Sequence, residues 1–228
     1  MSVFFRRRGE PPVIFDAIFA NNSWEEIIAA CQSGRVPDSW AVGDSKMMTI
    51  GGTNHQIDII GKNHDTYTAG GTAPLTFQTH DSYNTRGMNA RSTNSGGWTN
   101  CDMRRGNMPY FLAQMPSEVQ AGIREVNKLT SAGSYSSTIN TTADKLFLLS
   151  EIEIFGYTAN SVPGEGTQYA YYKAGNSKVK NVDGSAYNWW ERSPDANYES
   201  YFCCVGAGGT TVHDHANYPM GVAFAFCF

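Results

Sequence analysis

The histidines are the first residues in this sequence whose spacing suggests chemistry. His213 and His215 are two residues apart, so both imidazoles share one face if the segment is a strand. Asp214 or Asp195 could join them around a metal ion. Two histidines alone do not make a metal site, and we therefore expect neither a bound metal nor another cofactor.

Two His-Asp pairs suggest acid-base chemistry, namely His64-Asp65 and His80-Asp81. A working pair also needs a nucleophile or a bound water placed against it. The sequence has no G-x-S-x-G, H-E-x-x-H or glycine-rich phosphate motif to supply that context. We interpret His64 as a hydrogen-bonded structural residue at a strand end, and we predict that the protein is not an enzyme.

The richest collection of binding-type residues lies in the segment 193–218. Tyrosine offers large contact area at low entropy cost, and small polar residues adapt their hydrogen bonds, as in antibody loops. The alternative is an ordinary sheet end in which these residues are turn formers. We predict a binding surface, because functional residues concentrate on loops held by a rigid scaffold. The candidates are Asp195, Asn197, Tyr198, Ser200, Tyr201, Thr210, Thr211, His213, Asp214, His215, Asn217 and Tyr218.

The five cysteines indicate buried thiols. Their number is odd and no C-x-x-C pair occurs, which argues against a disulfide framework or a zinc site. Cys203 and Cys204 are neighbours on a predicted strand and should point to opposite faces. We therefore expect the chain to fold in a reducing cytoplasm.

Composition excludes several classes of function. The chain has 228 residues, 13% aromatic and 17% charged residues, a net charge of −4 and a pI near 5.7. An acidic protein of this kind is not expected to bind nucleic acid. No apolar run is long enough to insert into a membrane, and no signal peptide follows the basic cluster Arg6–Arg8, which we interpret as part of a solvated arm.

We predict that the elements that position these residues form an N-terminal arm, 1–20, and one domain, 21–228. A capping box at Ser23 and Glu26 predicts a helix ending near Gly34. A second helical region is predicted over 103–128. Strands are predicted around Ile57 and Ile59, and at Lys145–Ser150, Gln168–Lys173, Tyr187–Arg192, Tyr201–Val205 and Val222–Phe228. Early helices and late strands indicate an α+β fold with an antiparallel sheet flanked by two helices.

Several of these segments resemble the DUF6273 family over roughly residues 24–228. The motifs are Trp40–Asp44, Ile60–Asp65, Gly96–Trp98 with Met103-Arg104, Trp189–Pro194 and Gly221–Cys227. The opening Met1–Gly9 resembles bacteriophage members of the family. The family layout is similar to C-type-lectin-like domains, including the variable proteins of diversity-generating retroelements. The resemblance thus implies a stable lectin-like fold with a variable C-terminal patch.

The resemblance favours a non-catalytic phage virion protein, associated with the tail, whose C-terminal surface binds a host cell-surface protein or glycan. The alternative is a structural decoration or adaptor subunit that contacts other virion proteins through the arm; homo-oligomerisation stays open.

An enzyme of the formylglycine-generating type is disfavoured, since Cys203 and Cys204 point apart. Trp189-Trp190 could stack on sugars, but the calcium-dependent sugar triplets Glu-Pro-Asn and Gln-Pro-Asp are absent.

Overall fold

The computed structural model describes residues 14–228, and the expected solvated cluster Arg6–Arg8 lies outside them. A single-turn helix, η1 (Phe19–Asn21), opens the described chain. Phe19 is buried, with its ring centroid 5.3 Å from that of Trp40. The described end of the predicted arm therefore packs into the core of its own domain.

Helix α1 (Trp24–Gln32) confirms the first predicted helix. Ser23 accepts a hydrogen bond from the Glu26 backbone N–H, and the Glu26 carboxylate accepts one from the Ser23 N–H, which completes the capping box. Gly34 follows the last turn with a φ of +66°, a conformation that favours glycine and ends the helix. The helix buries one apolar stripe, which consists of Trp24, Ile27, Ile28 and Cys31.

The predicted helical region 103–128 is divided into short pieces and ends early. Pro109 lies in the first turn of α3 and Pro116 precedes α4, where a missing N–H costs no helical hydrogen bond. The last residues of the predicted region are not helical, because Val126 begins a strand. The pieces are the π-helical turn η2 (Met103–Asn107), α3 (Met108–Leu112) and α4 (Ser117–Gly122), and the short helix α2 (Gly97–Asn100) precedes the predicted region.

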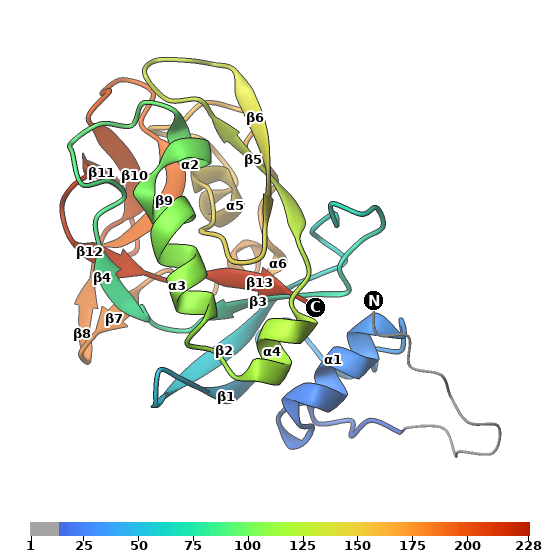
Figure 1. Ribbon diagram of the computed structural model, residues 1–228. Helices are drawn as coiled ribbons and strands as arrows, with labels where there is room; N and C mark the ends of the chain where they lie inside the picture. Colours follow the sequence, from blue (N-terminus) through green and yellow to red (C-terminus); the bar gives the residue numbers. More distant parts are fainter. Residues whose placement is uncertain (1–13) are drawn as a thin grey trace.

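Four antiparallel strands form one sheet, in the order β1-β2-β3-β13. Helices α1 and α4 lie side by side next to it (Figure 1). They approach so closely that a Cβ on Gly122 would lie 2.7 Å from the Ile28 side chain. The strands are β1 (Ser45–Ile50), β2 (Thr53–Lys62), β3 (Leu75–Thr79) and β13 (Ala225–Cys227).

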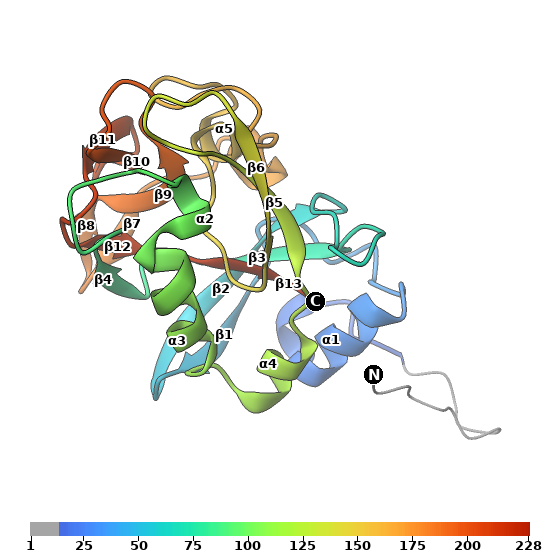
Figure 2. The same cartoon turned by 45° about the horizontal axis from the view of Figure 1, so that its top comes forward.

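Five strands form a second sheet, in the order β11-β10-β9-β12-β4. Its neighbours are antiparallel except for β9 and β12, which pair in parallel. Both views place β10 and β11 at the opposite end of the molecule from α1 (Figures 1 and 2). The strands are β4 (Asn84–Arg86), β9 (Trp189–Pro194), β10 (Tyr201–Val205), β11 (Thr211–His215) and β12 (Met220–Val222).

The predicted C-terminal strand Val222–Phe228 is wrong as one strand, although its burial is confirmed. β12 ends at Val222 and β13 begins at Ala225, so Phe224 lies on the connection between the two sheets. Every residue from Val222 to Phe228 is fully buried. β13 lies at the edge of its sheet in strand order, yet Phe147 forms a bridge to Ala225 beside it. The chain end thus ties both sheets to one core.

Two other predicted strands are wrong. Lys145–Ser150 is an irregular connection, with one bridge at Phe147. Gln168–Lys173 contains helix α6 (Ala170–Lys173), because Tyr172 turns inward and donates its hydroxyl to Gln78. The remaining elements are helix α5 (Glu151–Phe155) and the hairpins of β5 (Val126–Ser131) with β6 (Ile139–Asp144) and of β7 (Lys180–Val182) with β8 (Ser185–Tyr187).

A buried ionic centre joins these layers; it comprises Asp65, Lys128, Glu153, Tyr169 and Arg192. Lys128 contacts Asp65 at 2.8 Å and Glu153 at 2.7 Å, and Arg192 makes two bonds of 2.5 and 2.9 Å to Glu153. Burial raises the pKa of Asp65, but the Lys128 charge and the hydrogen bonds from Lys128 and Thr76 together outweigh burial and lower that pKa to about 2. Arg192 therefore has a structural role in this fold.

The described chain therefore has a mixed α+β fold with mostly antiparallel sheets. All five cysteines are free and buried, as predicted. Both Trp189 and Trp190 belong to the core, so neither is available to stack on a sugar. Among the described residues, no helix has the length and apolar character needed to cross a membrane.

Candidate binding surface

The β10–β11 hairpin positions the predicted binding residues by strand alternation. Tyr201 pairs with His215 and Cys203 with His213, so these four side chains share one face. Cys203 is fully buried under that face, whereas Tyr201 and both histidines are half-buried. The hairpin therefore places aromatic rings near the surface, above the buried Cys203 side chain.

Five rings form a continuous row, which we call the aromatic patch: Tyr198, Tyr201, His213, His215 and Tyr218. Tyr198 lies 5.1 Å from Tyr201 and 5.3 Å from His213 between ring centroids. Tyr201 lies 4.4 Å from His215, which lies 5.1 Å from Tyr218. Tyr198 and Tyr218 are 51% and 49% exposed at the two ends of the row. Two separate segments thus supply one surface.

Asp195 supports the patch from below, although the sequence placed it among the binding residues. Its side chain is fully buried. One carboxylate oxygen accepts the backbone N–H groups of Asn197 and Tyr198, at 2.7 and 2.9 Å, and the other lies 2.6 Å from His213 Nδ1. Asp195 therefore fixes a turn and a ring instead of meeting a ligand.

Two residues from a distant loop complete this support, and the sequence analysis did not identify them. The buried Asn94 amide donates to the carbonyl oxygens of Asp195, Tyr198 and Tyr201, at 2.9–3.1 Å. Ser92 Oγ lies 2.7 Å from His215 Nδ1. Both histidines of the patch are thus held at Nδ1 by groups of the protein itself.

A glycine makes room for the Asn94 contact. Gly133 has a φ of +72°, and a Cβ there would lie 1.9 Å from the Asn94 carbonyl oxygen. The neighbouring Ser134 N–H donates to Asn94 Oδ1 at 2.8 Å. The sequence signal for this support was a glycine- and serine-rich stretch, which predicts a loop but not its contact partner.

The other predicted binding residues fall into separate places. Asn197 and Asn217 are exposed beside the patch, and Ser200 is half-buried. Thr210 lies at the tip of the hairpin, at the opposite end from Tyr201, and Thr211 pairs with Val205 there. The structure therefore gathers the residues near 195–201 and 213–218 but leaves these two threonines outside.

Asp214 belongs to an open pocket that adjoins the patch. It lies on the other face of β11 from the two histidines. The pocket has a volume of about 330 Å³. Its lining includes two half-exposed rings, Tyr187 and Tyr218, and the side chains of Asn188 and Asp214. Tyr218 thus contributes to both the pocket and the aromatic patch.

The histidine pairs proposed for acid-base chemistry have other partners. His80 lies 2.6 Å from Asp58, and this hydrogen bond raises the pKa of His80, while Asp81 instead accepts from Asn181. His64 stacks on Tyr169, with a centroid distance of 3.9 Å, next to the ionic centre. Burial lowers the pKa of His64. Neither sequence-adjacent pair forms a dyad.

Residues 73–228 match the family model described as Domain of unknown function (DUF6273). The match covers more than half of the chain, and the chain belongs to this family. The predicted motifs Gly96–Trp98, Trp189–Pro194 and Gly221–Cys227 lie inside the matched range, together with the whole aromatic patch. Searches of curated proteins and of solved structures found no match.

Proposed function

We propose that this chain is a phage virion protein, associated with the tail, that binds a host cell-surface protein or glycan through the aromatic patch and catalyses no reaction. One observation carries the proposal: five rings from two segments form one row, held from below by Asp195, Asn94 and Ser92. Such preorganised aromatic surfaces give contact area without a large ordering cost.

The proposed lectin-like fold gives this surface a reason to vary. In the retroelement variable proteins that the chain resembles, a stable scaffold carries a diverse C-terminal patch. Mutation of adenines in Asn codons yields Asn, Asp, Tyr, His, Ser, Thr and Gly, and the patch with its flanking loops uses these types. The buried Phe202 and Cys204 beneath the hairpin would then stay constant while the outer residues change.

The N-terminal arm, 1–20, is proposed to contact other virion proteins. The described part of the arm lies with α1 at one end of the molecule, and the patch lies at the other (Figures 1 and 2). A chain docked through its arm would therefore keep the patch free for a host ligand. A subunit with a purely structural role would use the arm alone.

The test replaces only the two exposed ends of the row, in the variant Tyr198→Ala/Tyr218→Ala. The labelled full chain is measured on whole bacterial cells and on an array of bacterial surface polysaccharides. We expect at least a thirtyfold loss of affinity, because aromatic anchors each contribute about 2 kcal/mol or more to an interface. The matched control is Tyr110→Ala/Tyr157→Ala, which alters two rings that are 54% and 56% exposed on other elements.

Equal binding by the native chain and the patch variant, with both correctly folded, would contradict the proposed surface. The structural decoration or adaptor role would then replace it. A loss of binding in the control as well would show that the assay reports general tyrosine content and not this patch.

A further inference from the structure

Glu191, on β9, is a buried acid with no hydrogen-bond partner within residues 14–228. Its side chain is fully buried, and neither carboxylate oxygen accepts a hydrogen bond from these described residues. The neighbouring Arg192 donates its hydrogen bonds to Glu153 and to backbone carbonyls, and Lys128 forms ion pairs with Glu153 and Asp65. A buried carboxylate in this position needs a proton or a cation that the described residues do not provide.

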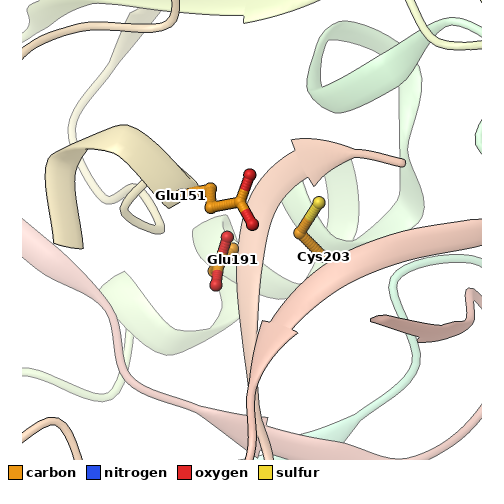
Figure 3. A group of neighbouring side chains, drawn as sticks. All are labelled: Glu151, Glu191 and Cys203. Atoms are coloured by element: carbon orange, nitrogen blue, oxygen red, sulfur yellow. The ribbon is translucent and has the colours of Figure 1, made fainter. Parts of the chain in front are cut away.

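Two further ligand-type side chains meet Glu191 at the same point. Figure 3 shows Glu151 from α5 and Cys203 from β10 gathered with Glu191 between the helix and the strands. One ligand atom from each of the three lies within 4.8 Å of the others, and all three residues are fully buried. The group therefore joins three elements that are distant in sequence.

Glu151 is held in place by hydrogen bonds from the 159–161 loop. Its Oε2 accepts the Ala159 and Ser161 backbone N–H groups, both at 2.9 Å, and the Ser161 hydroxyl at 2.7 Å. Its Oε1 has only the longer contacts to Asn160, at 3.1 and 3.3 Å, and so keeps capacity for another partner. A second carboxyl group this close to Glu191 adds to the cost of leaving Glu191 ionised without a cation.

We propose that Glu151, Glu191 and Cys203 bind a divalent cation of the zinc class. Calcium and magnesium take oxygen ligands, whereas zinc accepts a thiolate together with carboxylate oxygens. On binding, the thiol releases its proton to solvent and the metal takes its place, without any redox change. This group is separate from His213 and His215, the pair that the sequence had suggested.

The cation would strengthen the base of the candidate binding surface. Cys203 pairs with His213 across the hairpin, so a bond from its sulfur to the metal would link the strand carrying Tyr201 to α5 and β9. Because all three ligands are buried, the ion enters as the chain folds. The proposal does not depend on what the aromatic patch binds.

The experiment produces the full chain in bacteria grown with added zinc or, separately, cobalt. Metal content is measured after desalting, and near-ultraviolet absorption reports a thiolate-to-cobalt band. We expect about one zinc or cobalt per chain, a band that Cys203→Ser removes, and an unchanged band in the matched control Cys204→Ser. Glu191→Gln should also lose the metal.

Thermal unfolding separates a cation from a proton on Glu191. If the cation is present, removing it during refolding should lower the midpoint by roughly 5–10 °C relative to refolding at a hundredfold excess of free zinc over its dissociation constant. Metal-free native protein, together with Glu191→Gln that melts at or above the native midpoint, would overturn the proposal in favour of a protonated carboxyl. If Glu191→Gln fails to fold, the cobalt band in the two cysteine variants decides: its absence in the native chain and in Cys204→Ser overturns the proposal.

Discussion

The ionic centre and the aromatic patch use polar and aromatic groups in opposite ways. In the ionic centre, Arg192 and Glu153 are fully buried and satisfy each other, together with Lys128. In the patch, His213 and His215 are held by the protein at Nδ1, while Tyr198 and Tyr218 extend toward solvent. The charged groups of the ionic centre bond to other groups of the protein, whereas the aromatic patch leaves one side of its rings available to a ligand.

The comparison teaches where to look for function in this fold. Charged residues in the sequence attract attention as candidate catalytic groups, yet here they connect the loop after β2 to β5, α5 and β9. A buried pair is weak evidence for net stability, but removing one partner leaves an uncompensated charge. The two regions should therefore respond differently to substitution.

The largest effect is expected from Arg192→Met. It removes the partner of Glu153 and leaves a buried carboxylate with Lys128 alone, so the free energy of unfolding should fall by about 3–5 kcal/mol. Denaturant titration measures the change. The matched control is Arg86→Met, whose exposed guanidinium donates to Asn84 and should contribute about 1 kcal/mol or less. Equal losses in the two variants would contradict a special role for the ionic centre.

A smaller effect is expected from Asn94→Ala, which tests whether the patch depends on its support. The replacement removes the donor to three carbonyl groups and should cost about 2–3 kcal/mol. Binding by the patch should weaken as well, although no ring is altered. Asn176→Ala, which loses one exposed contact, is the control. If the variant is less stable but binds as the native chain does, Asn94 stabilises the fold without contributing to binding by the patch.

The pH dependence of stability should reflect one carboxyl group whose pKa is raised by folding and another whose pKa is lowered. Burial raises the pKa of Glu165 to about 7, above its unfolded value near 4.5, so the folded state binds more protons and stability falls as pH rises between these values. Asp65 has its pKa lowered to about 2, so its contribution is present above about pH 4 and is lost as pH falls toward 2.

Glu165→Gln should reduce the decline between about pH 4.5 and 7, because the amide does not ionise, while Glu191, whose pKa burial also raises, retains part of the decline. Thermal unfolding across that range in the native chain and the variant measures this. His80 has a raised pKa and also loses its contribution as pH rises, so a residual slope above about pH 6.5 is expected in both proteins. An unchanged slope from pH 4.5 to 6 in the variant would assign the effect to another group.

Local sequence signals predicted much of the fold. The capping box at Ser23 and Glu26 placed α1, and the apolar run Tyr201–Val205 placed β10. These features depend on neighbours within a few residues. By contrast, the tyrosines of Gln168–Lys173 favour a strand by propensity, but the buried hydroxyl contact of Tyr172 decides for a helix. Tertiary contacts overrode local preference there.

The candidate site was predictable only in its outer layer. A hairpin that brings Tyr201 opposite His215 follows from two strands and a glycine-rich turn. The support does not, because Asn94 reaches residues about a hundred positions later in the chain. Glu191, which has no hydrogen-bond partner among the described residues, also has a sequence context that does not distinguish it from an ordinary strand residue. Long-range burial, which no short motif encodes, separates these residues from ordinary surface residues.

The smallest effect on stability is expected at the exposed ends of the patch. Tyr198→Ala/Tyr218→Ala should change the free energy of unfolding by about 1 kcal/mol or less, because both side chains are about half-exposed and their neighbours stay packed. His213→Ala should cost more, since it leaves the fully buried Asp195 carboxylate without its side-chain partner. Denaturant titration of both variants gives the ranking. If the double tyrosine variant proves the less stable of the two, the rings at the ends of the row belong to the core, and the division between a fixed base and a free surface does not hold. If the ranking is as expected, a loss of binding in the tyrosine variant reports recognition alone.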